Sequence, residues 1–275
     1  MQGFSVNESK PVSVTHSEMS ILHLTVLGSG TSMGVPTLAC HCAVCESPDP
    51  RDKRTRPSVL LSYNGRNVVI DTTPDFRFQA MREKLDSLDA VLYTHAHADH
   101  VLGLDDIRPY NLKQRGVVPI YASIETQSTL RRQFAYVFDD APTVSSLPRV
   151  ELHTIDGPFE LFGLKLIPIA ANHGPTPVLG FRFGNAAYLT DFSSVPEKSK
   201  ELLRGLDDFI LDALRYTPHP MHSNVAQSLA LVDELKPKRA WFTHICHDLG
   251  HEQANAKLPK EVQLSYDGLK FEVRI

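Results

Sequence analysis

Short apolar runs separated by polar residues recur along most of the chain. Runs of about four to eight residues, rich in Val, Ile, Leu and Phe and ended by turn-forming residues, are typical of buried β-strands. On this pattern we predict strands at residues 21–27, 58–63, 67–71, 88–93, 119–122, 150–155, 159–161, 164–170, 178–183, 186–189, 209–213, 239–243, 262–264 and 269–273.

A few segments carry apolar residues three or four positions apart, which is the helical period. We predict helices at residues 76–84, 125–138, 196–203, 224–235 and 248–257. The clearest is 224–235, where Val225, Leu229 and Val232 share one face. Residues 105–116 show no such period and are expected to form a polar loop. Because two groups of strands alternate with helices, we expect an α/β fold, an αββα sandwich of two packed mixed sheets flanked by helices.

The chain shows no sign of division into separate domains. Residues 21–275 contain no repeat period and no long linker, so we predict one domain there. Residues 1–20 lack the apolar stretch of a secretory signal and are predicted to form a flexible tail. No apolar run reaches the ~18 residues that a membrane helix needs. We therefore expect a cytoplasmic protein without membrane contact.

The most unusual stretch is Thr-His-Ala-His-Ala-Asp-His, which follows the predicted strand 88–93. His95 and His97 are two residues apart, so in extended chain their side chains point the same way. Asp99 and His100 come after the turn and can face a neighbouring point. Imidazole nitrogen and carboxylate oxygen suit zinc, manganese, iron or cobalt. Chance rarely places these four side chains directly after a buried strand, so we predict a metal site rather than an exposed polar loop.

Two adjacent metal ions need more ligands than this stretch supplies. His173, Asp191 and His244 each follow a predicted buried strand, as the first motif does. Taken singly, each is as typical of a hydrogen-bonded polar residue at a strand end. Together they complete the donor set of a two-metal centre.

Three of the four cysteines fall within six residues, as Cys40-x-Cys42-x-x-Cys45. This spacing is typical of a metal site in a reducing compartment, and a structural zinc requires a fourth ligand. Cys246 and His247 both offer one. We favour a Cys3His zinc site over an iron–sulfur cluster that uses Cys246 and over an unliganded group of thiols.

Composition narrows the substrate class. The formal net charge is −4, which gives no electrostatic footprint for a long nucleic acid. A small phosphorylated substrate remains compatible, because bound metal ions supply local positive charge. The glycine-rich segment 28–34 lacks the Gly-Lys-Ser/Thr ending of a phosphate-binding loop. We expect it to be a tight turn that brings backbone close to the site.

His-x-His-x-Asp-His, followed by an isolated His, an Asp in Thr-Asp and a His in Thr-His, resembles the metallo-β-lactamase superfamily. The resemblance runs from about residue 22 to residue 275. It implies one metal held by His95, His97 and His173, a second held by Asp99, His100 and His244, and Asp191 bridging them. Diiron oxidoreductases of the superfamily usually carry Glu where this chain has His97, which favours hydrolysis over redox chemistry.

The resemblance also implies a mechanism. Two divalent ions, Zn or Mn, would lower the pKa of a bridging water from ~15.7 to about 7. The resulting metal-bridging hydroxide would attack phosphorus, while the metals neutralise charge on the other phosphate oxygens.

The glycine-rich start, the cysteine motif and Thr-His-x-x-His together are similar to the PhnP-type phosphoribosyl cyclic phosphodiesterases. This resemblance implies that His247 completes the structural zinc site, and it suggests a homodimer. It also implies a catalytic His222, with His219 as the competing candidate and an exposed helix-start residue as the alternative. Asp71 and Asp75 either orient ligand imidazoles or are plain strand-end polar groups.

The leading hypothesis is therefore a dinuclear metal phosphodiesterase that acts on a small phosphodiester, cyclic in the family it resembles. A tRNA 3′-processing nuclease shares the metal motifs, but the acidic charge argues against it. A glyoxalase II-like thioesterase lacks the cysteine motif. A non-enzymatic zinc-binding scaffold would need only one closed four-ligand site.

Overall fold

The computed structural model describes residues 21–139 and 145–275, so the tail predicted at residues 1–20 lies outside the described residues. The described chain forms two seven-stranded sheets. One sheet has the order β14-β1-β2-β3-β4-β5-β6, made of β1 (Ile21–Gly28), β2 (Ser58–Tyr63), β3 (Arg66–Ile70), β4 (Ala90–Leu92), β5 (Val118–Ala122), β6 (Val150–Thr154) and β14 (Lys270–Arg274). The other has the order β13-β12-β11-β10-β9-β8-β7, made of β7 (Phe159–Leu161), β8 (Leu164–His173), β9 (Thr176–Phe183), β10 (Ala186–Leu189), β11 (Asp208–Asp212), β12 (Arg239–Thr243) and β13 (Val262–Leu264).

Each sheet is half antiparallel and half parallel. In the first, β14, β1, β2 and β3 pair antiparallel and β3 to β6 pair parallel. In the second, β10 to β13 pair parallel and β7 to β10 pair antiparallel. Parallel strands end at the same edge of a sheet. The ends of β3 and β4, and those of β10, β11 and β12, are therefore two places where polar side chains can gather.

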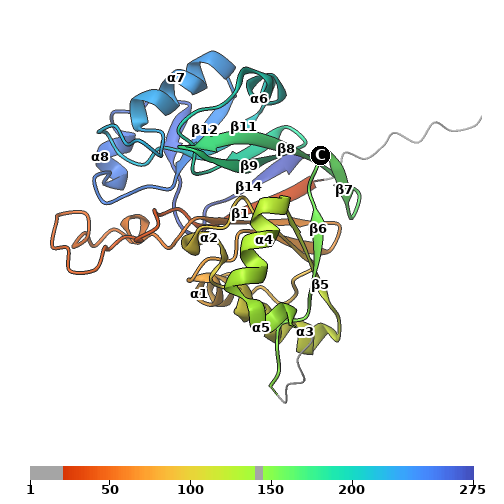
Figure 1. Ribbon diagram of the computed structural model, residues 1–275. Coiled ribbons are helices and arrows are strands. Elements are labelled where there is room, and N and C mark those ends of the chain that lie inside the picture. The colour runs from red at the N-terminus through yellow and green to blue at the C-terminus, as the bar shows by residue number, and fades with distance from the viewer. Residues whose placement is uncertain (1–20, 140–144) are drawn as a thin grey trace, which may run out of the picture.

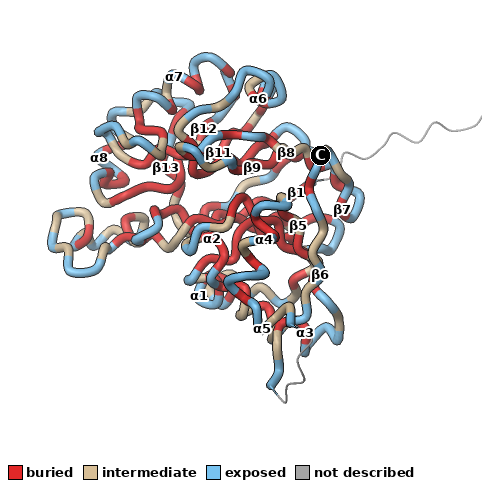
Figure 2. Tube along the Cα trace, viewed as in Figure 1, coloured by how far each residue is buried: buried red, intermediate tan, exposed pale blue. Residues whose placement is uncertain are grey.

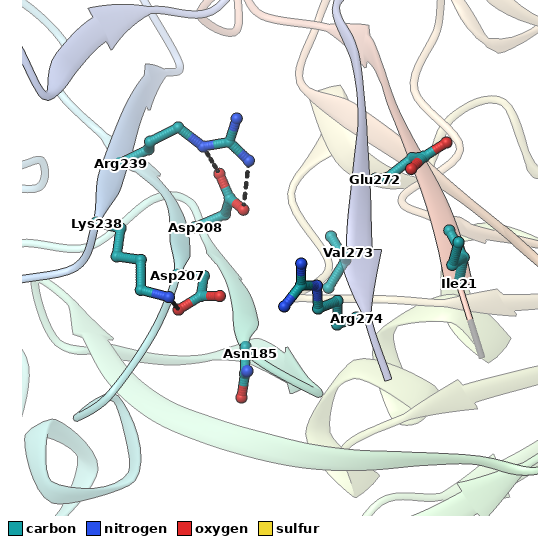
Figure 3. A pocket seen from close by; sticks show the side chains of 9 residues that line it. All are labelled: Ile21, Asn185, Asp207, Asp208, Lys238, Arg239, Glu272, Val273 and Arg274. Atoms are coloured by element: carbon teal, nitrogen blue, oxygen red, sulfur yellow. Dashed lines mark hydrogen bonds and ion pairs between the residues drawn. The ribbon is translucent and has the colours of Figure 1, made fainter. Parts of the chain in front are cut away.

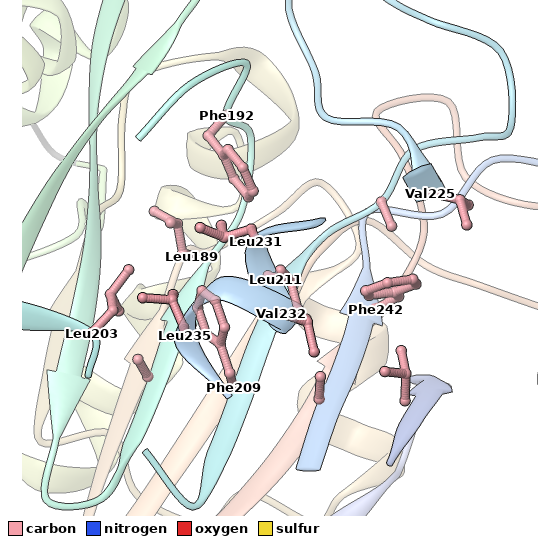
Figure 4. Packing of buried hydrophobic residues seen from close by; sticks show 14 of the residues in the cluster. Leu189, Phe192, Leu203, Phe209, Leu211, Val225, Leu231, Val232, Leu235 and Phe242 are labelled. Carbon is pink, nitrogen blue, oxygen red and sulfur yellow. The ribbon is translucent and has the colours of Figure 1, made fainter. Parts of the chain in front are cut away.

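Alternation along the strands builds three apolar layers. Val59 and Leu61 of β2 belong to the core between the sheets, whereas Leu60 packs with the residues under the first group of helices. In β11, Ile210 faces the central core and Phe209 and Leu211 face the second group of helices (Figure 4). Figure 2 shows the buried chain concentrated in the strands. The predicted αββα sandwich is confirmed.

Helices cover the outer face of each sheet (Figure 1). The first sheet carries α1 (Phe76–Arg82), α2 (Ala98–Val101), α3 (Arg108–Gln114), α4 (Ile124–Gln133) and α5 (Ala135–Phe138). The second carries α6 (Glu197–Leu202), α7 (Val225–Leu235) and α8 (His251–Asn255). Asn224 begins α7 in a capping box with Gln227. No helix within the described residues is long and apolar enough to cross a membrane.

The polar loop predicted at residues 105–116 was wrong. This segment forms a short 3-10 helix, η2 (Leu104–Ile107), and then α3. Pro109 lies in the first turn of α3, where its missing N–H costs nothing. The side chain of Asn111 is buried and binds the carbonyls of Gly116 and Arg149. This buried polar side chain interrupted the apolar period that reveals a helix.

The glycine-rich segment 28–34 packs backbone against backbone. A Cβ atom on Gly28 would lie 1.8 Å from the carbonyl oxygen of Arg56, and one on Gly30 would lie 2.8 Å from that of Arg54. Only glycine allows such an approach. Gly30 also forms a β-bridge with Ile245, one residue after His244. The segment therefore brings its backbone close to His244, as expected of a tight turn.

Candidate metal centre

Three polar residues at strand ends adopt a backbone conformation that residues other than glycine rarely take. Asp71 follows β3, Asp191 follows β10 and His244 follows β12, and their φ angles are 66°, 55° and 56°. Such strain costs of order 1–3 kcal/mol per residue and is concentrated at functional sites. All three side chains are buried at the edge where the two sheets meet the α2 segment.

The stretch between β4 and α2 supplies the other central donors. A hydrogen bond between the two sheets positions this stretch: the amide of Leu179 in β9 donates to the carbonyl oxygen of Thr94 at 3.0 Å. His97 is the N-cap residue of α2, and Asp99 and His100 lie within this one-turn helix. The turn thus separates the two pairs of donors, as the sequence predicts.

One group of donors consists of three imidazoles. The donor atoms of His95, His97 and His173 lie within 4.8 Å of one another. Burial lowers the pKa of His173 to about 4, and burial also holds the pKa of His95 well below its usual value. Both side chains are therefore neutral at pH 7, which is the form that binds a metal.

The second group contains two carboxylates and two imidazoles: Asp99, His100, Asp191 and His244. One oxygen of Asp191 lies 3.2 Å from Nε2 of His100, and the other lies 3.1 Å from Nε2 of His244. Burial opposes charge on Asp191, but the neighbouring His244 and His100 outweigh it and hold its pKa well below the usual range. Asp191 therefore carries a negative charge between two imidazoles.

Three buried nitrogens in these two groups form no hydrogen bond among the described residues: Nε2 of His95, Nε2 of His100 and Nε2 of His244, the last two facing Asp191 at ion-pair distance. Buried polar atoms are rarely left unpaired in proteins. Without a metal, burial opposes protonation of His244, yet Asp191 and Asp99 raise its pKa to about 10. The site therefore attracts positive charge. Its imidazoles, which lose their protons when a metal binds, and its carboxylates fit two divalent ions of the zinc or manganese kind.

A hydrogen-bonded set of residues orients His100. Its Nδ1 lies 2.7 Å from Oδ2 of Asp71, and the same carboxylate accepts the backbone N–H and the hydroxyl of Thr94. Such contacts fix the ring and its tautomer. Asp71 therefore contacts a predicted ligand. Asp75 does not, because it pairs with Arg56 instead.

His222 lies beside both donor groups. Its ring centroid is 4.5 Å from that of His173 and 4.6 Å from that of His244. Its Nδ1 lies 2.8 Å from Oδ2 of the fully buried Asp212, the last residue of β11. The ring centroid of His219 lies 5.1 Å from that of His222.

The sequence analysis missed Asp212. It ends the apolar run Phe-Ile-Leu-Asp, much as Asp71 ends Val-Val-Ile-Asp, and that parallel was the available signal.

The three motif cysteines converge on His247. Their sulfurs lie 3.1 Å (Cys40), 3.5 Å (Cys42) and 3.5 Å (Cys45) from its Nδ1. Cys246 is absent from this group of donors; its sulfur accepts the backbone N–H of Asp248. The backbone N–H of Cys45 helps lower the pKa of Cys42 to about 6, whereas burial raises that of Cys45 to about 11. Three thiols and one imidazole at these distances match a closed structural zinc site.

The stability of the protein should depend on pH through the buried His251, whose backbone N–H donates to Asp52. Burial, aided by Arg51 and Arg54, lowers its pKa to about 4 from the ordinary 6.5. The folded protein thus binds this proton less readily than the unfolded chain. The resulting stability is complete above pH 6.5 and is lost as the pH falls toward 4, up to roughly 3 kcal/mol.

Urea unfolding of wild type and His251→Phe between pH 4.5 and 7.5 measures this effect. We expect the loss of stability on acidification to be smaller in the variant. Equal losses in the two proteins would exclude His251 as the cause.

A cavity of about 660 Å³ lies at the opposite ends of β11 and β12 (Figure 3). Its charged groups are largely paired, Asp208 with Arg239 and Asp207 with Lys238. None of the metal-donor residues lines it. This cavity is therefore separate from the two groups of metal donors.

Comparison with known proteins agrees with this placement. Residues 66–245 match the family model described as the β-lactamase superfamily domain, which spans β3 to the residue after His244. The chain belongs to the metallo-β-lactamase superfamily. It carries the fold of the superfamily's hydrolases.

Individual proteins add detail to the family assignment. The crystal structure of a new diphosphatase from the PhnP family is similar to this chain at 52% identity, with a TM-score of 0.89, over 94% of this chain and 99% of that one. The predicted resemblance to the PhnP family is thus confirmed. Zn(2+)-bound PqqB from Methylobacterium extorquens shares the fold at 19% identity, with a TM-score of 0.74 over 90% of this chain and 99% of that one.

An octanoyltransferase of Porphyromonas gingivalis is 37% identical over 250 residues, 89% of this chain and 50% of that protein. The chain therefore spans about half the length of this curated relative.

Proposed function

We propose that the protein is a metal-dependent hydrolase that cleaves a small phosphodiester, with two divalent ions in the active site and one structural zinc. The observation that carries the proposal is the meeting of two donor groups at Asp191, whose two oxygens face His100 and His244 at 3.2 and 3.1 Å. His95, His97 and His173 would hold one ion, and Asp99, His100 and His244 the other, with Asp191 between them.

When bound, the two ions would supply a hydroxide nucleophile and positive charge next to the phosphate. Asp191 would set the spacing of the ligands on its two sides. His222 would donate a proton from Nε2 to the leaving oxygen, which requires the ring to carry protons on both nitrogens; Asp212 engages Nδ1 and leaves Nε2 as the nitrogen that can face the substrate. Asp212 would keep that imidazole in one orientation.

Two features support a small phosphorylated substrate. The net charge of −4 disfavours the binding of a long polyanion. The relative that is 52% identical over almost its whole length is a diphosphatase of the PhnP family. That likeness favours a second candidate, hydrolysis of a diphosphate linkage, which needs the same attack at phosphorus. We propose that the protein acts as a homodimer in the cytoplasm, without long nucleic acids or membranes as partners.

A substrate panel tests the proposal. Protein loaded with zinc or manganese is assayed against bis-p-nitrophenyl phosphate, cyclic ribose phosphates, a dinucleoside diphosphate, lactoylglutathione and nitrocefin. We expect hydrolysis of the phosphodiesters; cleavage of the diphosphate linkage alone would favour the second candidate. Activity confined to the thioester or the lactam would exclude both.

Replacing His222 should separate proton donation from metal binding. We expect His222→Gln to lower kcat by about 10²–10⁴-fold for a cyclic ribose phosphate, whose leaving alkoxide requires a proton. The loss should be much smaller for bis-p-nitrophenyl phosphate, because nitrophenolate leaves without one. Steady-state kinetics on both substrates, with the metal content checked by mass spectrometry, measure this difference. His219→Gln is the matched control, and an equal or larger loss there would move the role to His219.

A further inference from the structure

His244 differs from the other buried imidazoles of the centre. His100 is held through its Nδ1 by Asp71, and His173 through its Nδ1 by the carbonyl oxygen of Met221. Nδ1 of His244 is buried and has no hydrogen-bond partner among the described residues. Nδ1 therefore does not anchor this ring, and its position is set by the backbone that carries it together with Asp191 on the Nε2 side.

Hydrogen bonds fix the first part of that backbone from outside β12. The amide of Ile245 donates to the carbonyl oxygen of Ser29 at 2.9 Å, and the amide of Cys246 donates to that of Leu214 at 3.0 Å. These contacts cover one side of the chain directly after His244. The carbonyl oxygens of Cys246 and Leu249 are turned toward a different partner, Arg54.

Arg54 is a buried cation with most of its donors engaged. Nη1 donates to the Cys246 carbonyl at 3.1 Å, and Nη2 donates to the Leu249 carbonyl at 2.7 Å and to Oδ1 of Asp52 at 2.8 Å. Its Nε donates to the carbonyl of Arg51 at 3.2 Å. The side chain is completely inaccessible to solvent. Burying a guanidinium costs several kcal/mol unless such bonds offset it, so the geometry around it is closely determined.

We propose that Arg54 is a positioning residue for His244: by binding the carbonyls of Cys246 and Leu249, it sets the backbone of residues 244–249 and so the place of the His244 ring. The inference rests on the proposed metal centre. Residue 247 of the same segment meets the motif cysteines. Residues 244–249 are therefore contacted by two groups: by the buried Arg54 through two carbonyls, and by the motif cysteines through His247.

Arg54→Lys tests the inference, because an ammonium keeps the charge but cannot span both carbonyls and Asp52. Arg51→Lys is the matched control: Arg51 lies in the same loop but pairs with Asp49 and Glu252 and contacts neither carbonyl. The metal-free forms of both variants and of the wild type are titrated with cobalt(II), at a temperature at which each protein is folded.

In Arg54→Lys we expect a 10–100-fold loss of affinity at the His/Asp centre and a similar fall in kcat, with KM changed less than about threefold. The visible bands of cobalt at that centre should change. The thiolate-to-cobalt charge-transfer band should change less, because it arises from the three motif cysteines, which lie outside residues 244–249. Arg51→Lys should match the wild type. If Arg54→Lys does not fold, Asp52→Asn, which removes the carboxylate that holds Arg54, carries the same expectation.

A lowered melting temperature with unchanged cobalt affinity, spectrum and kcat would overturn the inference and leave Arg54 a purely structural residue. Because affinity and spectrum need no substrate, this result is distinct from a failure of the proposed phosphodiesterase activity. A wild-type protein that binds no metal at the His/Asp centre would overturn both.

Discussion

Asp191→Ala should abolish hydrolysis without unfolding the protein. The variant removes the carboxylate that stands between His100 and His244, and with it the shared ligand of the two ions. Charge stabilisation by bound metals is worth several kcal/mol in the transition state, and each 1.36 kcal/mol is tenfold in rate. We therefore expect kcat to fall by about 10³-fold or more, with metal loss from the His/Asp centre. Steady-state kinetics and metal analysis measure both effects.

Asp207→Ala is the control for this experiment. Asp207 is also an acidic residue of the second sheet, but it lies at the opposite end of β11 and pairs with Lys238. Its replacement should leave kcat and metal content unchanged. Circular dichroism of Asp191→Ala should match the wild type. Retention of more than about a tenth of the activity in Asp191→Ala would show that the carboxylate does not bridge catalytic metals.

Cys42→Ser should remove one zinc ion per chain and destabilise the fold. A metal that binds only the folded state stabilises it by about 4.1 kcal/mol at 1,000 times its dissociation constant. For a chain of this size, that loss corresponds to a fall in melting temperature of about 8–16 °C. Metal analysis of the purified variant and a thermal melt in excess zinc measure the two effects.

Cys246→Ala distinguishes the two candidate fourth ligands. Because Cys246 is absent from the cluster that joins the motif cysteines to His247, its replacement should leave the zinc content unchanged. His247→Ala should behave like Cys42→Ser. Zinc loss in Cys246→Ala with retention in His247→Ala would reverse the assignment, and full zinc content in Cys42→Ser would remove the structural site altogether.

Most of the fold could be predicted from the sequence, because strands and the polar residues at their ends follow patterns of neighbouring residues. Apolar runs such as residues 209–213 predict buried strands, and polar residues directly after such runs indicate a site at the edge of the sheet. His173, Asp191 and His244 were found in this way, and the structure brings them together with the first motif. The α3 helix escaped because the buried Asn111 has long-range partners that no local pattern records.

The remaining features depend on contacts between distant segments. A role for Asp212 could not be predicted from the sequence, because it depends on the loop after β11 that places His222 within hydrogen-bond distance. The choice between Cys246 and His247 is a matter of side-chain direction in adjacent residues, which spacing alone cannot decide. The sequence analysis did not single out Arg54, because its role requires the carbonyls of a segment almost two hundred positions away.

Titration of metal-free protein with zinc or manganese tests the central claim most directly, with hydrolysis of bis-p-nitrophenyl phosphate followed at each addition. With zinc we expect three ions per chain at saturation, one at the cysteine cluster and two at the His/Asp centre; with manganese we expect only the two at the His/Asp centre. Phosphodiesterase activity should rise only as the His/Asp centre fills. Full activity without metal, or three bound ions with no hydrolysis of any phosphoester, would contradict it.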